Sequence, residues 1–156
     1  MVSLNLLPRQ LIVFSILTMT HSGAVAQNLP GTSPTGSDAP PATVHIIHGY
    51  SASPSDHWFP WLKRQLTAEG HSVTIHRMPD SDAPDANAWK SALEQRITDV
   101  GPRIFFVAHS LGCISLLHYL GALPEGTQIG GIVLVSGFSQ PIASLPELDA
   151  FTAPDV

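Results

Sequence analysis

The feature that most constrains this chain is residues 103–114, where a short apolar run leads into a serine and then a second apolar segment. Two phenylalanines and a valine in residues 104–107 are typical of a buried parallel strand, and an apolar helix is expected after Ser110. Between them, Ala108–Gly112 reads A-x-S-x-G, a variant of the G-x-S-x-G nucleophile elbow. The alternative interpretation is that Ser110 is an ordinary N-cap at a strand–helix junction.

Strands and helices alternate along the rest of the chain at a spacing typical of β-α-β units. We expect strands at residues 43–47, 72–76, 104–107 and 129–135, helices at 60–69, 89–100 and 111–120, and a last helical turn within 145–151. This order predicts an α/β fold, a three-layer α/β/α sandwich around a parallel sheet. Ligands bind beyond the carboxyl ends of the strands in such sheets, where both His48–Tyr50 and Ser110 follow a strand.

The predicted chemistry is nucleophilic attack by Ser110 on an acyl carbonyl. A helix N-terminus favours the negative charge that develops on the carbonyl oxygen. We therefore assign the oxyanion to the backbone N–H groups of Leu111 and Tyr50. His48, Gly49 and His109 are expected to line the pocket.

The general base is harder to find in the sequence. The α/β-hydrolase order is Ser, then an acid, then His, but the only histidine after Ser110 is His118, two helical turns below it. Asp149 and Asp155 follow no recognisable strand. His48 and His57 precede the serine, and a loop histidine more often bonds its own loop. The side chain of His109 is expected to point away from Ser110.

Composition excludes several classes of function. The net charge of −5 provides no basic surface for nucleic acid. One cysteine allows no intrachain disulfide, and Cys113 is interpreted as a buried structural thiol rather than a reactive one. The histidines show no metal-binding spacing, so neither a metal nor an organic cofactor is expected.

The first 26 residues have the pattern of a signal peptide, with an apolar core at residues 11–19 and an A-x-A site at Ala24–Ala26. The apolar core is too short to span a membrane, which predicts an exported chain without a stable span after cleavage. The alternatives are an uncleaved anchor, or a misassigned start codon upstream of a cytoplasmic protein. Residues 27–42 are rich in Pro, Gly, Ser and Thr and are interpreted as a disordered linker before the domain at 43–156.

Four segments together resemble the YdeN-like serine hydrolases, a group that includes retinoblastoma-binding-protein-nine-like proteins. They are residues 48–54, 57–62, 108–113 and 134–138. The resemblance implies an α/β-hydrolase fold, a nucleophile at Ser110 and small-molecule ester or related acyl substrates. It also implies an Asp and a His on two further strand ends, which we expect beyond Val156, so that the chain is truncated with its fourth strand as an exposed apolar edge.

Two hypotheses follow from these residues. The first is a serine hydrolase that forms an acyl-enzyme on Ser110. The second is an inactive fragment, pseudoenzyme or binding module, because loss of the catalytic His alone costs a serine hydrolase roughly a millionfold in turnover.

Overall fold

The structure is a computed structural model that describes residues 40–152. The predicted signal peptide at residues 1–26 and the linker up to residue 39 lie outside the described residues. Within residues 40–152, no helix combines the length and apolar character needed to cross a bilayer.

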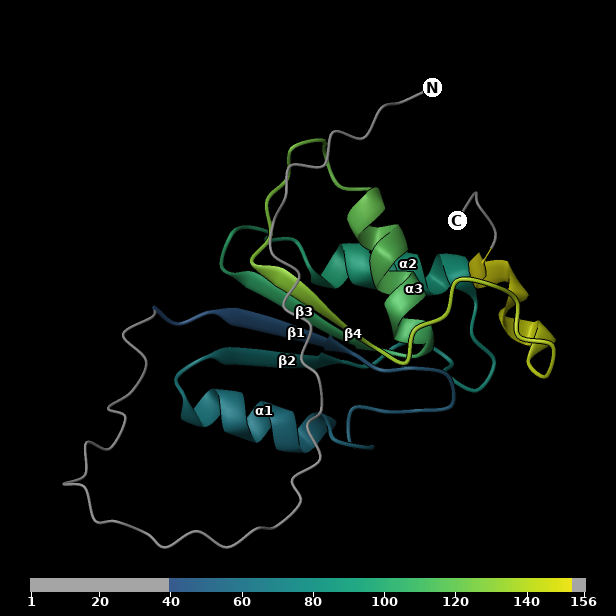
Figure 1. Cartoon of the computed structure of the whole chain (residues 1–156), viewed down its shortest axis with the longest axis horizontal. Helices are drawn as coiled ribbons and strands as arrows, with labels where there is room; N and C mark the ends of the chain where they lie inside the picture. The colour runs from purple at the N-terminus through teal and green to yellow at the C-terminus, as the bar shows by residue number, and fades with distance from the viewer. Residues whose placement is uncertain (1–39, 153–156) are drawn as a thin grey trace, which may run out of the picture. The chain divides into compact units, whose positions relative to one another are not determined.

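The described chain is built on a parallel sheet with strand order β2-β1-β3-β4 (Figure 1). The strands are β1 (Thr43–Ile47), β2 (Ser72–His76), β3 (Ile104–His109) and β4 (Gly131–Val135). Ile47 of β1 is in register with His76 of β2 and Ala108 of β3, so the carboxyl ends of the three strands share one edge. This confirms the predicted α/β fold and brings the segments after β1 and β3 side by side.

Helices cover both faces of the sheet, as predicted. The helix α1 (Phe59–Ala68) lies on one face, and α2 (Ala86–Arg96) and α3 (Leu111–Gly121) lie on the other (Figure 1). A short 3₁₀ helix, η1 (Pro146–Thr152), packs against the α2 and α3 side. It corresponds to the helical turn expected within residues 145–151.

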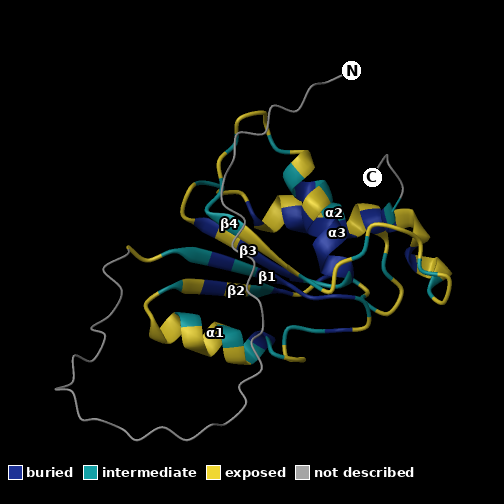
Figure 2. Cartoon of the chain, in the orientation of Figure 1, coloured by how far each residue is buried: buried dark blue, intermediate teal, exposed yellow. Residues whose placement is uncertain are grey.

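Two apolar cores fill the space between these layers (Figure 2). The smaller core, on the α1 face, contains Phe59, Val44, Ile46, Val73 and Val107. The larger core, on the opposite face, joins Trp89 and Leu93 of α2 to the sheet, to α3 and to η1. Phe106 and Ala108 of β3 point into the larger core while Val107 points into the smaller one, which is the side-chain alternation of a strand buried on both faces.

Several element boundaries differ from the sequence prediction by one to four residues, and two of these differences have a clear local cause. The helix α2 ends at Arg96 instead of near Val100, because Ile97 leaves helical geometry and the following Thr and Asp favour a loop. The helix α1 begins at Phe59, after a turn in which the Asp56 carboxylate accepts a hydrogen bond from Ser53 N–H at 2.7 Å. The backbone of His57 has a φ of 53°, which a right-handed helix cannot accommodate and which separates that turn from α1.

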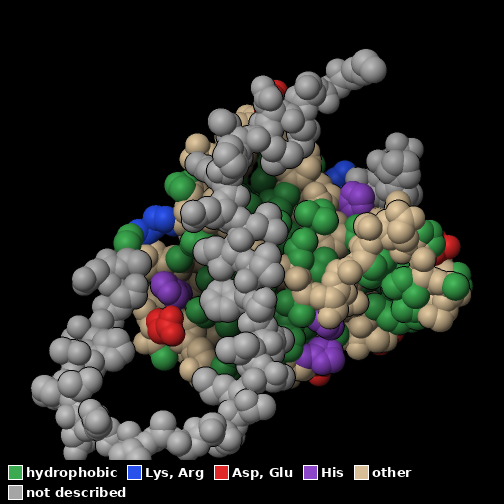
Figure 3. All heavy atoms as spheres, in the orientation of Figure 1, with side chains coloured by type: hydrophobic (Ala, Val, Ile, Leu, Met, Phe, Trp, Pro, Cys, Tyr) green, Lys and Arg blue, Asp and Glu red, His purple; other side chains and the backbone are tan. Residues whose placement is uncertain are grey.

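The strand β4 forms an exposed edge of the sheet. Its central side chains, Ile132, Val133 and Leu134, are 42%, 55% and 41% exposed, although all three are apolar. Figure 3 shows hydrophobic side chains spread over one face of the molecule, and Phe105 and Leu117 are further large apolar residues that are exposed. The exposed apolar edge expected from the sequence is present in the described part of the chain.

Candidate active site

Ser110 lies at the sharp turn between β3 and α3. Its backbone has a φ of 50° and a ψ of −122°, a sparsely populated conformation that costs a non-glycine residue about 1–3 kcal/mol. Ser110 occupies the N-cap position of α3, but its hydroxyl makes no capping hydrogen bond. The ordinary N-cap interpretation therefore does not explain this serine, and the strained turn is the geometry of a nucleophile elbow.

Backbone hydrogen bonds hold this turn against the neighbouring strand. Ser110 N–H donates to the Val135 carbonyl at 2.9 Å, and the Ser110 carbonyl accepts from Cys113 N–H at 2.9 Å. Both backbone groups of the serine are therefore engaged within the protein, which leaves its hydroxyl group as the part free for chemistry.

Two glycines allow the loop after β1 to pass close to this turn. A Cβ on Gly112 would lie 2.4 Å from the His48 carbonyl oxygen, and a Cβ on Gly49 would lie 2.9 Å from Ser110 Cβ. Both separations are shorter than real Cβ contacts, so each position requires glycine for steric reasons. Gly112, the second small residue of A-x-S-x-G, thus allows α3 to pack against the end of β1, and Gly49 allows its loop to pack against Ser110.

The ring of His48 holds that loop in place. Its ring is completely buried, and its Nε2 accepts a hydrogen bond from Met78 N–H at 3.0 Å. Because Nε2 accepts, Nδ1 carries the proton and donates to the Gly49 carbonyl at 2.9 Å. Burial lowers the pKa of His48, which keeps the ring neutral. His48 is predicted to line the pocket. Both of its ring nitrogens bond the loops after β1 and β2, so its backbone is the part that lies at the carboxyl ends of the strands.

His109 lies on the α1 side of the elbow, in a cluster of rings. Its ring centroid is 5.3 Å from that of His57, 5.9 Å from Phe59 and 6.1 Å from Trp58. Among the described residues, its Nδ1 is the one buried side-chain polar atom without a hydrogen-bond partner. Burial, followed by the neighbouring His57, lowers the pKa of His109, so its ring stays neutral beside the serine.

The ring of His118 is bonded away from Ser110, which agrees with its predicted place two helical turns below the serine. Its Nε2 donates to the Phe151 carbonyl of η1 at 2.8 Å, on the outer part of α3. Cys113 is buried, burial raises the pKa of its thiol, and its Sγ lies 3.5 Å from the Val135 carbonyl oxygen. These features match the prediction of a structural thiol at this position.

The predicted oxyanion donors flank the serine. Leu111 is the first residue of α3, so its N–H has no partner within the helix. Tyr50 directly follows Gly49, the residue whose Cα lies against Ser110. Both N–H groups lie just after the carboxyl ends of β1 and β3. Their assignment as oxyanion donors stays a prediction.

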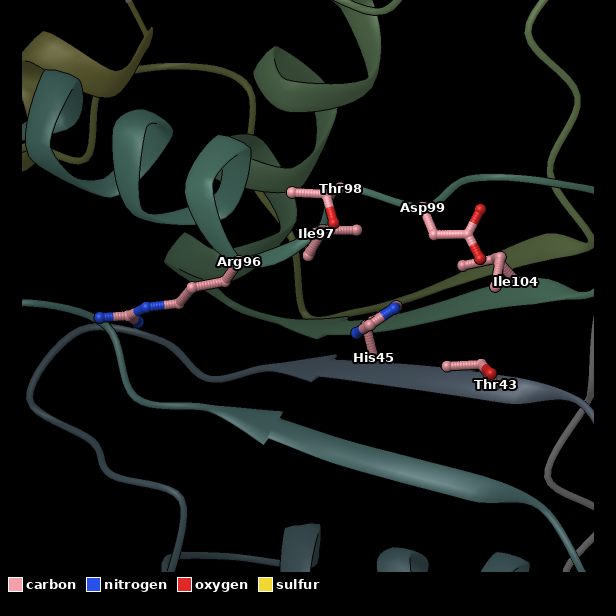
Figure 4. A pocket seen from close by; sticks show the side chains of 7 residues that line it. All are labelled: Thr43, His45, Arg96, Ile97, Thr98, Asp99 and Ile104. Atoms are coloured by element: carbon pink, nitrogen blue, oxygen red, sulfur yellow. The ribbon is translucent and has the colours of Figure 1, made fainter.

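No group of three or more potential metal ligands occurs in the described part of the chain. A cavity of about 150 Å³ lies away from the elbow, between β1, β3 and the segment after α2. It is lined by His45, Arg96, Ile97, Thr98, Asp99, Thr43 and Ile104 (Figure 4). This cavity contains neither Ser110 nor the loop after β1, so it belongs to a different region of the sheet.

A family model described as serine hydrolase matches residues 44–155. The chain belongs to the serine hydrolase family. It is 44% identical over 109 residues to "Putative hydrolase YdeN" of Bacillus subtilis, covering 70% of this chain and 57% of that protein. The crystal structure of the ydeN gene product matches with a TM-score of 0.69 at 42% identity, covering 71% of this chain and 60% of that one. The chain therefore spans less than two thirds of the length of its relative.

These matches confirm the family and the α/β fold that the motifs indicated. The sequence did not reveal the ring contacts of His48, since a histidine after a strand has the same appearance whether it lines a pocket or bonds its own loop. It also did not reveal that η1 lies next to Tyr50, because 97 residues separate Tyr50 from Glu147.

Proposed function

We propose that this chain acts on carboxylic-ester or related acyl substrates through an acyl-enzyme on Ser110. The observation that carries the proposal is the backbone of Ser110, strained at φ 50° with its hydroxyl uncommitted to capping. Proteins retain such strain where the surrounding structure enforces it, and these places cluster at functional sites.

In the proposed reaction, Ser110 Oγ attacks the acyl carbonyl carbon and the carbonyl oxygen becomes an oxyanion held by the N–H groups of Leu111 and Tyr50. The alkoxide leaving group departs when the tetrahedral intermediate collapses, which leaves the acyl group on Ser110. The hydroxyl proton must pass to a base, and the leaving group must regain a proton. Water then attacks the acyl-serine to release the acid. No step uses a metal or an organic cofactor.

A second candidate is a chain that accepts an acyl group or a ligand without turnover. The observation that favours it is that several histidine rings are already hydrogen-bonded to other groups. His118 is bonded to η1, both ring nitrogens of His48 are engaged, and His45 is paired with His76 at 2.9 Å. None of these four rings is available to take the proton of Ser110, and His109 is the neighbouring ring whose Nδ1 has no hydrogen-bond partner among the described residues.

Intact-protein mass spectrometry with p-nitrophenyl acetate tests the proposal and separates the two candidates. Without an efficient general base, hydrolysis of the alkyl ester on Ser110 is slower than attack of the serine on the activated p-nitrophenyl ester, so we expect one acetyl group to accumulate on Ser110 with negligible multiple turnover. Ser110→Ala should abolish labelling, whereas Ser91→Ala, at an exposed serine in α2, should leave it unchanged. Labelling that persists in Ser110→Ala would refute the assignment of the nucleophile.

A further inference from the structure

The loop after β1 is tied to a segment far along the chain. The Tyr50 hydroxyl donates a hydrogen bond to Glu147 Oε1 at 3.0 Å, and Glu147 belongs to η1. Tyr50 itself packs against the larger apolar core as a partly buried residue. The loop that carries a proposed oxyanion donor is therefore held at its side chain by the segment that follows β4.

The 3₁₀ helix η1 is a firm anchor for this contact. Leu148 and Phe151 are 2% and 1% exposed, and the Phe151 carbonyl accepts the hydrogen bond from His118. The Phe151 ring packs edge-on against Trp89 at 5.7 Å, and Trp89 packs edge-on against His48 at 5.8 Å. Since Glu147 directly precedes a buried leucine, its backbone is held in place next to the larger core, while its side chain is exposed.

The next residue of the loop is held by the segment that follows β2. Ser51 N–H donates to the Ser81 carbonyl at 2.8 Å, and the Ser51 hydroxyl donates to Asp82 Oδ1 at 2.5 Å. Ser51 has a φ of 49°, so these bonds hold a strained backbone. His48 fixes the start of the loop through its ring, and Ser51 is fixed at the end of the loop. Between them, the Tyr50 side chain is held by its hydrogen bond to Glu147 of η1 and by packing against the larger core.

We propose that Glu147 is a positioning residue that, through the phenol of Tyr50, keeps the Tyr50 N–H directed at the acyl oxygen of a substrate bound at Ser110. This rests on the function proposed above. The phenol of Tyr50 is protonated over the whole neutral range, and its hydrogen bond to the Glu147 carboxylate raises the pKa of Tyr50 further. Glu147 touches no substrate, and its effect passes through the loop.

The experiment compares Tyr50→Phe, Glu147→Ala and Glu147→Gln in the full chain. Removing an oxyanion donor outright costs roughly 10²–10³ in rate, so loosening one should slow Ser110 acylation by p-nitrophenyl acetate by about 10-fold. The ester concentration for half-maximal rate should not change, because the contact acts on the oxyanion rather than on ground-state binding. Glu147→Gln keeps an acceptor oxygen and should largely restore the rate. Glu125→Gln, at an exposed glutamate in the turn after α3, is the matched control and should react like the wild type.

Amide hydrogen exchange provides the second measurement. Residues 49–51 should exchange faster in Tyr50→Phe and Glu147→Ala than in the wild type, with unchanged exchange in β1 and β3. Wild-type acylation and wild-type exchange in both variants would overturn the positioning role while leaving the proposed function intact. A wild-type chain that is never acylated at Ser110 would refute the proposed function, and the positioning role with it.

Discussion

The paired histidines of β1 and β2 should make the stability of this chain strongly dependent on pH. His45 Nδ1 and His76 Nε2 lie 2.9 Å apart, and the ring of Phe106 stacks on His45 with centroids 5.5 Å apart. His76 is 4% exposed. Figure 4 shows His45 rising from β1 toward Thr98 and Asp99, with the Arg96 side chain directed away from it. One ring must donate and the other accept, and because the pKa of both histidines is lowered, two neutral imidazoles make this bond at neutral pH.

Burial, followed by the neighbouring His45 and Arg96, lowers the pKa of His76 from 6.5 to about 4. Burial also lowers the pKa of His45, against the opposing effect of Asp99. Between pH 6.5 and pH 4 the unfolded chain therefore binds a proton at His76 that the folded chain does not. His76 therefore leaves the free energy of unfolding at its full value above pH 6.5 and lowers it as the pH falls from 6.5 to 4. Below pH 4, His76 causes no further change. A shift of 2.5 units corresponds to ~3 kcal/mol lost across this window.

Urea denaturation of the wild type and His76→Gln at pH 7, 5.5 and 4 measures this effect. The carboxylates contribute equally to both proteins, so the difference between their free energies of unfolding isolates the histidine. We expect the wild type to lose ~3 kcal/mol more than His76→Gln between pH 7 and pH 4. Ser91→Ala, at an exposed serine of α2 that does not titrate, should follow the wild type. If His76→Gln retained the wild-type dependence on pH, the burial argument would be wrong.

Three further predictions concern other parts of the chain. Gly112→Ala should lower the free energy of unfolding by about 3 kcal/mol, because its Cβ would lie 2.4 Å from a backbone oxygen. Gly121→Ala should raise it by up to ~1 kcal/mol, because a Cβ there meets nothing within 4 Å. Thermal denaturation of both variants checks this. Val133→Lys at the β4 edge should raise the concentration at which light scattering detects association, with an unchanged circular dichroism spectrum, and association equal to the wild type would show that the edge is not responsible. Residues 1–30 fused to a periplasmic reporter should export it and be cleaved after Ala26; retention of the reporter in the cytoplasm would support the misassigned start codon.

The fold could be predicted from the sequence because hydrophobic periodicity and strand–helix alternation are local signals. Residues 43–47 and 72–76 form strands as expected, and the helix after Ser110 begins at the next residue. The parts of the candidate site that consist of residues adjacent in sequence, such as Ala108–Gly112, could also be predicted. The contacts that organise it connect distant segments, such as His48 with Met78 and Tyr50 with Glu147, and no local pattern specifies them. The early end of α2 was missed because the apolar spacing continues to Val100, which still packs against the core from a loop.

The backbone of this chain points to the same edge of the sheet without reference to any motif. Among residues 40–152, every non-glycine residue with a positive φ lies in a segment that follows the carboxyl end of a strand: Ser51 and His57 after β1, Asp80 after β2, Ser110 after β3 and Ser136 after β4. At the amino ends of the strands, among residues 40–152, positive φ values occur only at Gly70 and Gly126, and glycine adopts them at little cost. An L-residue in a left-handed conformation costs about 1–2 kcal/mol, so the strain at the carboxyl edge amounts to several kcal/mol. That strain must be offset by the buried strands and by contacts such as those of His48. Strained backbone clusters at functional sites, so we expect the carboxyl ends of the strands to carry the function, independently of the motif around Ser110.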